Sequence, residues 1–151
     1  MGFGSEILTD DGVALKIVDD LKLSLNNDLF DFQKVNLISL ETLNLLAGFK
    51  KICLVDAAKN KNESIGTVKY FQLADFQNSL HLINSHDLSL KHLINLGKLL
   101  SYSVTDNIQI ITINVQEAEE FGHRFSKSLN FQYLKIYQEI LKNMLIIKNE
   151  I

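Results

Sequence analysis

Proline and tryptophan are absent from this chain of 151 residues, and cysteine occurs only once. A lone cysteine excludes a disulfide within the chain, and Cys53 lies in an apolar run where a buried, unreactive thiol is expected. No apolar stretch is long enough to cross a membrane, and no signal-peptide pattern opens the sequence. We therefore expect a cytoplasmic protein without a membrane partner.

An excess of basic residues is also lacking. The net charge is −3, so the chain has no basic field with which to hold nucleic acid. Apolar residues make up 46% and charged residues 22%, as in ordinary soluble globular proteins. The length suits one core, and no repeat, low-complexity segment or linker interrupts it. Residues 1–151 are therefore expected to form a single domain, and the protein is expected to be a monomer.

The spacing of apolar residues predicts helices alternating with strands. Helices are expected over residues 11–25, 40–47, 88–100 and 126–148. Strands are expected over residues 32–38, 51–55, 67–73 and 108–115. The last helix is expected to bury Leu129, Tyr133, Leu134, Tyr137, Ile140, Leu141, Met144 and Leu145. This alternation predicts a single-domain, three-layer α/β/α sandwich with a mostly parallel sheet of about four to five strands.

Three short segments carry most of the chemical information. Asp11 lies at the start of the first helix, Asp56 follows the strand at 51–55, and His86 precedes the helix at 88–100. Because ligands bind outside the carboxyl ends of strands in open α/β sheets, we expect these three side chains at one edge of the sheet. Two carboxylates and an imidazole can hold a divalent metal while leaving coordination positions open.

Each of these residues also has a purely structural explanation. Asp10 and Asp11 can cap the first helix or be stabilised by its dipole. Asp56 can bind backbone groups at the start of a loop, and His86 can cap a helix or face solvent. Taken together, the segments favour Asp10 as the cap and Asp11 as the ligand. A dinucleotide site at residues 2–4 is excluded because no third glycine lies at the required offset and no strand precedes.

The start of the chain poses a topological problem. A Gly-x-Gly turn normally ends a buried strand, yet only Met1 precedes Gly2. Either the central first strand is absent or the true start lies upstream of Met1. The centre of an open sheet cannot stay empty without exposing unpaired backbone groups. We therefore expect extra residues before Met1, or a compensating contact from another segment or subunit.

In this order and spacing, the segments resemble the hydrogenase maturation endopeptidases. That family opens with Gly-x-Gly-Asn and then Asp-Asp/Glu-Gly, and it continues with an acidic residue ending a strand and a histidine before Leu-x-Leu. Its motifs are matched here by Gly2-Phe3-Gly4-Ser5, Asp10-Asp11-Gly12, Val55-Asp56-Ala57, Ile65-Gly66-Thr67-Val68, Ser85-His86-Asp87-Leu88-Ser89-Leu90, Phe121-Gly122 and Phe125-Ser126. The chain departs from the pattern in two places. Ser5 replaces the asparagine, and residues 37–40 replace an Asp-Gly-Gly-Thr-like box thought to help recognise the substrate.

The resemblance implies an endopeptidase that removes the C-terminal tail of the [NiFe]-hydrogenase large subunit after nickel insertion. Asp11, Asp56 and His86 would be both the catalytic residues and the nickel contacts of an aspartic-type peptidase. Gly4, Ser5 and Ser85 would contact the substrate. The resemblance further implies that no cofactor is tightly bound, because nickel arrives within the large-subunit precursor. The alternative is a degenerate, non-catalytic member that serves as a binding module for a hydrogenase subunit or another protein.

Overall fold

The computed structural model describes residues 1–25, 28–76 and 90–150. Its strands are β1 Gly2–Phe3, β2 Lys34–Val35, β3 Ile52–Ala58, β4 Val68–Gln72 and β5 Ile108–Asn114. Its helices are the 3-10 turn η1 Asp10–Gly12, α1 Val13–Ser24, α2 Thr42–Leu46, α3 Leu90–Leu99 and α4 Lys127–Glu150. Among these described helices, none is long and apolar enough to cross a membrane.

One sheet joins all five strands in the order β2-β1-β3-β5-β4. β2, β1, β3 and β5 are parallel, and only the edge strand β4 runs antiparallel to its neighbour. The predicted mostly parallel α/β sheet is therefore confirmed. Its longest strands, β3 and β5, pair over their whole length from Ile52 opposite Ile108 to Ala58 opposite Asn114.

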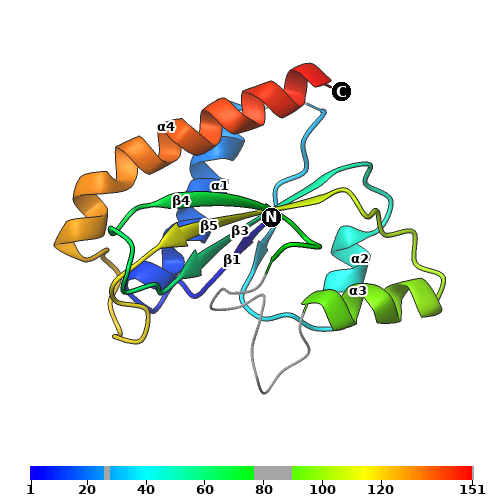
Figure 1. The fold of residues 1–151 in the computed structure, drawn as a ribbon, viewed down its shortest axis with the longest axis horizontal. Helices are drawn as coiled ribbons and strands as arrows, with labels where there is room; N and C mark the ends of the chain where they lie inside the picture. Colours follow the sequence, from blue (N-terminus) through cyan, green and yellow to red (C-terminus); the bar gives the residue numbers. More distant parts are fainter. Residues whose placement is uncertain (26–27, 77–89, 151) are drawn as a thin grey trace.

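Helices cover both faces of the sheet, which gives the expected three layers (Figure 1). Along β3 and β5 the side chains alternate between two cores. Val55 and Ile111 pack in the core beneath α1 and α4. Leu54 and Ile110 pack in the other, beneath α2 and α3. All four side chains are at most 3% exposed, so both sides of the central strands are dry.

The buried face of α4 differs from the prediction in two positions. Leu134 and Leu145 are 64% and 43% exposed and point away from the sheet. The helix instead buries Leu129, Ile136, Ile140, Met144 and Ile147. A single helix packed on one sheet face buries only a narrow stripe, and this stripe lies on the side of Ile136 and Ile147.

The first strand is present, which corrects the expectation that it is missing. Gly2 and Phe3 themselves form β1 between β2 and β3. The Gly2 amide donates to the Gln33 carbonyl at 2.9 Å, and the Val55 amide donates to the Met1 carbonyl at 2.9 Å. Two residues are enough to pair both neighbours at the carboxyl end of the sheet, so no unfilled gap separates its halves there.

Candidate active site at the carboxyl end of the sheet

The loop from β1 to α1 holds Asp11 against the end of β1. Gly4 has φ +153°, and a Cβ at that position would lie 2.2 Å from the Asp11 carbonyl oxygen. Only glycine allows this close approach. The Ser5 amide then donates to Asp11 Oδ2 at 2.8 Å. The Asp11 side chain is 1% exposed and sits at the entry to α1, where the helix dipole favours a negative charge.

Asp56 lies within β3 and not after it, because the strand continues to Ala58. It pairs with Thr112 of β5 and is fully buried. η1, which carries Asp11, packs against β3. The parallel topology therefore brings the two predicted carboxylates to the same end of the sheet, as the sequence analysis expected.

The roles of the remaining predicted site residues stay predictions. His86 and Ser85 lie outside the described residues, so their positions stay predictions. Gly4 and Ser5 lie on the loop that holds Asp11, and their contact with a substrate also stays a prediction. Within the described part of the chain, no three histidine, cysteine, aspartate or glutamate side chains gather closely enough to hold a metal ion. A three-ligand site thus depends on His86.

Asp10 has a structural role, as predicted, but its hydrogen-bond partners are not those of a cap on the first helix. It does not cap its own helix, since neither η1 nor α1 has a side-chain cap bond. Asp10 accepts hydrogen bonds from the Ser126 amide at 2.7 Å, the Ser126 hydroxyl at 2.8 Å and the Glu117 amide at 3.1 Å. The fully buried carboxylate therefore fastens the first loop to the loop that follows β5.

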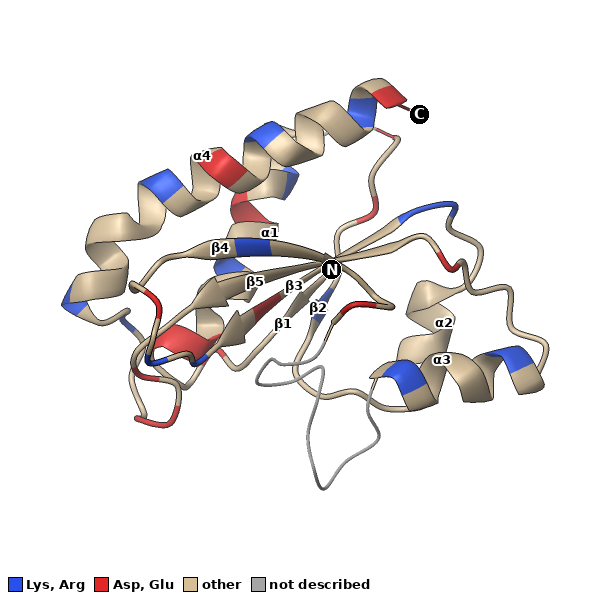
Figure 2. Cartoon of the chain, viewed as in Figure 1, with Lys and Arg blue, Asp and Glu red and all other residues tan. Residues whose placement is uncertain are grey.

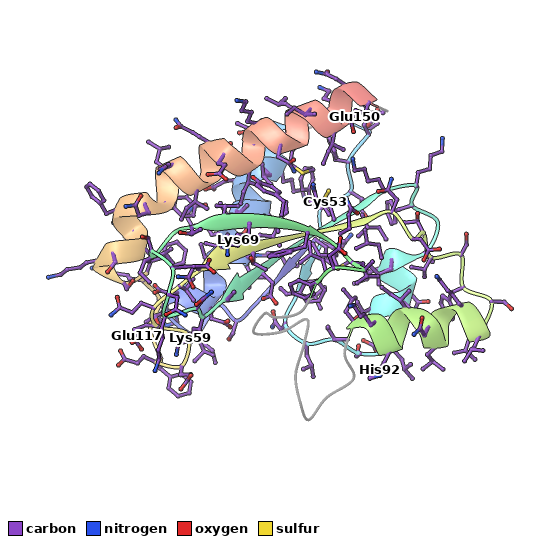
Figure 3. The ribbon with its side chains drawn as sticks, viewed as in Figure 1. Cys53, Lys59, Lys69, His92, Glu117 and Glu150 are labelled. Carbon is purple, nitrogen blue, oxygen red and sulfur yellow. The ribbon has the colours of Figure 1, made fainter. Side chains whose placement is uncertain are left out.

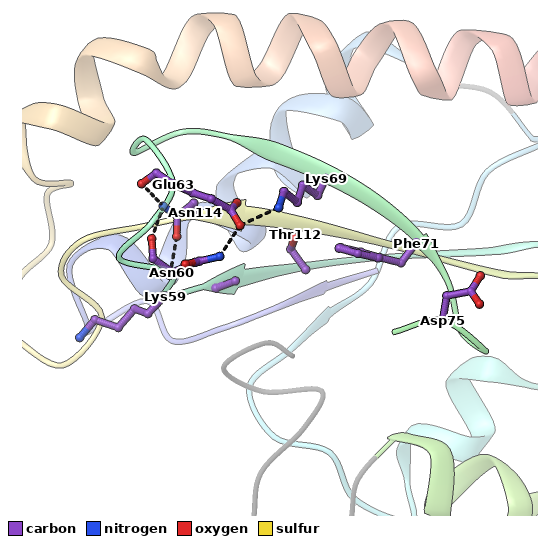
Figure 4. A pocket seen from close by; sticks show the side chains of 9 residues that line it. Lys59, Asn60, Glu63, Lys69, Phe71, Asp75, Thr112 and Asn114 are labelled. Atoms are coloured by element: carbon purple, nitrogen blue, oxygen red, sulfur yellow. Dashed lines mark hydrogen bonds and ion pairs between the residues drawn. The ribbon is translucent and has the colours of Figure 1, made fainter. Parts of the chain in front are cut away.

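A pocket of about 210 Å³ is lined by Ala58 at the end of β3, by Thr112 and Asn114 of β5, and by Lys69 and Phe71 of β4 (Figure 4). Strand pairing sets Asp56, Thr112 and Lys69 in one row across β3, β5 and β4. Side chains opposite each other on neighbouring strands share a face. Thr112 and Lys69 line the pocket, as does Ala58, two residues after Asp56 on β3, so the pocket lies on the face of the sheet that carries the Asp56 side chain.

Asn114 fixes the loop that borders this pocket. Its side-chain oxygen accepts from the Asn60 amide at 2.8 Å, and its side-chain nitrogen donates to the carbonyls of Asn60, Glu63 and Ser64. Glu63, on that loop, forms an ion pair with Lys69 at 2.6 Å. Thr112, Asn114 and Lys69 were not predicted as site residues. Thr112 and Asn114 stand out in the sequence only as polar positions in β5, which also contains Gln109, and Lys69 carries no comparable signal.

Open α/β sheets as a class bind ligands outside the carboxyl ends of their strands, and Asp11 and Asp56 lie at that edge of this sheet. The model of the hydrogenase maturation protease family matches residues 37–143, which is more than half of the chain. The chain belongs to the hydrogenase maturation proteases, a family of peptidases. Asp56 and His86 lie inside the matched range and Asp11 lies before it.

Solved structures agree with this fold. The hydrogenase maturating endopeptidase HybD from E. coli superposes with a TM-score of 0.73 and 17% identity, over 95% of this chain and 88% of that one. The [NiFe] hydrogenase maturation protease HybD from Thermococcus kodakarensis gives 0.66 and 22% identity, over 93% of each chain. HycI from the same organism gives 0.69 and 15% identity, over 93% of this chain and 87% of that one. No curated protein matches the chain significantly in sequence.

Proposed function

We propose that this peptidase removes the C-terminal tail of a nickel-loaded [NiFe]-hydrogenase large subunit, and that Asp11, Asp56 and His86 recognise the nickel carried by that substrate. The observation that carries the proposal is the packing of η1 against β3, which brings two almost fully buried carboxylates to one end of the sheet. Membership of the hydrogenase maturation proteases supplies the reaction class.

The three proposed donors suit a metal that belongs to the substrate and not to the enzyme. Two carboxylates and one imidazole are too few ligands to saturate a divalent ion, and imidazole nitrogen is a suitable donor for nickel. The remaining ligands would come from the substrate, so no metal needs to reside in the free enzyme. Contact with the nickel would fix the scissile bond relative to Asp11 and Asp56, and positioning alone can supply much of a rate enhancement.

Two chemical steps are open to this arrangement once the bond is in place. One carboxylate can take a proton from the attacking water as a general base. Alternatively, the substrate's nickel can polarise the scissile carbonyl as a Lewis acid. We expect the peptide on one side of the scissile bond to enter the pocket lined by Thr112 and Lys69.

Cleavage of a purified, nickel-loaded large-subunit precursor tests the proposal. Asp11→Asn, Asp56→Asn and His86→Ala are each expected to abolish the shift to the shorter subunit on a gel. Asn at position 11 keeps an oxygen to accept the Ser5 amide, so the loop is expected to hold. If the Asp11 and His86 variants trim the precursor at the parental rate, the assignment of the site is wrong.

Leu54→Ala serves as the control for the scaffold. Leu54 is fully buried in the strand that carries Asp56. Its truncation is expected to cost about 2–5 kcal/mol of unfolding free energy through the cavity it leaves. Thermal melts of all four variants separate this loss of stability from loss of chemistry. If the parental protein binds the precursor but never shortens it, the alternative of a non-catalytic binding module replaces the proposal.

A further inference from the structure

Two loops at the carboxyl end of the sheet pair into a short ribbon, formed by residues 7–9 and 120–122. Leu8 and Phe121 form an antiparallel bridge. The Gly122 amide donates to the Ile7 carbonyl at 3.0 Å, and the Thr9 amide donates to the Glu120 carbonyl at 3.0 Å. A Cβ on Gly122 would lie 2.8 Å from Thr9 Cγ2, so glycine allows the two segments to close.

This loop ribbon presents large apolar side chains to solvent. Phe121 is 82% exposed and Ile7 is 54% exposed. Leu8 is half-buried, and as the bridge partner of Phe121 it shares that side of the ribbon. Single exposed apolar residues are common on proteins and need no explanation. Phe121 and Leu8 on one side of a hydrogen-bonded ribbon, beside a candidate active site, do need one. Ile7 precedes Leu8 and belongs to the opposite side by the alternation of side chains along a strand.

The loop ribbon is also held rigidly from beneath. The Asp10 carboxylate accepts hydrogen bonds from Glu117 and Ser126, and the Asp10 amide donates back to the Glu117 carbonyl at 2.8 Å. The Thr9 hydroxyl donates to the same carbonyl at 2.9 Å. Folding has therefore already fixed the backbone that displays Phe121. Such preorganisation lowers the entropy that binding must overcome.

Charged side chains border the loop ribbon (Figure 2). Glu6 forms an ion pair with Lys34 at 2.8 Å, and Glu119 forms one with Lys59 at 3.0 Å. Glu120 makes no ion pair with any described residue. An apolar centre with an exposed aromatic side chain and a polar rim is the usual anatomy of a protein interface.

We propose that the loop ribbon is a docking surface for the folded body of the large-subunit precursor, with Phe121 as its anchor. The proposal rests on the function proposed above. One strand of the ribbon leads directly through Asp10 to Asp11, so a protein seated on Phe121 would lie next to the candidate active site. A peptidase that trims the tail of a folded protein must contact the body from which the tail emerges. The matching surface on the precursor is an apolar patch with charged residues around it.

Phe131 offers a matched control for Phe121. It is 85% exposed but lies on α4, outside the loop ribbon. The assay measures binding of nickel-loaded precursor to immobilised Asp11→Asn protein, so that cleavage does not consume the complex. Adding Phe121→Ser is expected to weaken binding by about tenfold or more, as for an interface hot spot, and Phe131→Ser by less than about twofold.

Steady-state cleavage provides a second readout. In the otherwise parental enzyme, Phe121→Ser is expected to raise KM by a similar factor while kcat stays within about twofold, because uniform binding is lost and the chemistry is not. Leu8→Ser is the second variant, because Leu8 shares the side of Phe121, and it is expected to act in the same direction. It replaces Phe121→Ser if the latter lowers the melting temperature.

Several results would overturn the docking surface. One is equal precursor binding by the Phe121→Ser and Phe131→Ser proteins. Another is self-association of the parental protein, in sedimentation, that Phe121→Ser abolishes, since the face would then join two copies. The two proposals fail separately. If Asp11→Asn stops cleavage while Phe121→Ser binds normally, only the docking surface is wrong. If the parental protein never cuts but Phe121→Ser loses binding, only the endopeptidase proposal is wrong.

Discussion

The two ends of the sheet differ in what holds them together. At the carboxyl end, buried polar side chains tie loops to one another, with Asp10 joining the first loop to the loop after β5. At the amino end, a cavity of about 640 Å³ lies between mostly apolar side chains, among them Phe30, Ile52 and Met144. Figure 3 places Lys59 and Glu117 at the first end and Cys53 and Glu150 at the other.

The two ends also differ in the surroundings of their buried ionisable groups. Asp10 and Asp11 are buried, and each accepts at least one hydrogen bond from a backbone amide. At the amino end, the Met1 amino group donates to the Cys53 carbonyl at 2.8 Å, and burial lowers its pKa. Burial also raises the pKa of the Cys53 thiol. Buried carboxylates at the carboxyl end thus have backbone donors, whereas burial at the amino end acts against the charged forms of the Met1 amino group and the Cys53 thiol.

The substitution expected to disturb the carboxyl end of the sheet most is Gly4→Ala. The new methyl group would meet the Asp11 carbonyl at 2.2 Å in a backbone conformation that L side chains rarely adopt. We expect a loss of about 3–4 kcal/mol of unfolding free energy together with lost cleavage, because the Asp11 loop must move. Urea denaturation measures the first effect and the precursor assay the second.

Gly48→Ala is the control for that substitution. Gly48 has φ +85°, but apart from its chain neighbours no heavy atom lies within 4 Å of the position that a Cβ would occupy. The left-handed conformation alone is expected to cost about 1 kcal/mol and to leave cleavage unchanged. Equal losses for the two glycine variants would show that the contact with Asp11 does not matter.

Asp10→Ala tests whether buried carboxylates hold the carboxyl end. The substitution leaves the buried amides of Glu117 and Ser126 without their acceptor. We expect a loss of about 2–3 kcal/mol, measured by urea denaturation. Asp31→Ala removes an exposed carboxylate near the amino end and is expected to change stability by less than about 0.5 kcal/mol. A neutral Asp10→Ala variant would contradict the structural role of Asp10.

The smallest effect is expected at Cys53, and it concerns reactivity more than stability. Only the thiolate reacts with disulfide reagents, and burial raises the pKa of this half-buried thiol. The native protein is therefore expected to react more slowly than the chain unfolded in urea at pH 7 to 8. The native rate should rise as the pH increases through and above the ordinary thiol range. Native and unfolded rates that coincide would show that the amino end is open to solvent.

The long elements could be predicted because their patterns are dense. β3 and β5 are mostly apolar over seven residues each, and α4 repeats apolar residues at helical spacing over 24 residues. β1 and β2 have two residues each, and two residues carry no period. The first strand was therefore expected to be missing, although Gly2 and Phe3 were themselves the strand. α4 was placed correctly, yet two of its leucines face solvent, because apolar composition alone does not tell which side meets a sheet.

One part of the candidate site could likewise be predicted from the sequence, and another part could not. Parallel strands share one carboxyl edge, so the convergence of Asp11 and Asp56 could be predicted from their order along the chain. The role of Asp10 could not, because its partners Glu117 and Ser126 are 107 and 116 residues away. The pairing of Leu8 with Phe121, on which the docking proposal depends, has the same long range.

The family motifs, the α/β class and the positions of the long helices and strands can be derived from the amino-acid sequence, because burial and period depend on neighbouring residues. The strand order, the pairing of two residues of β1 with β2 and β3, and the partners of Asp10 depend on contacts between distant segments. A buried carboxylate acquires its structural role from the donors that surround it. For Asp10 those donors arrive only when the loop after β5 folds back onto the start of the chain.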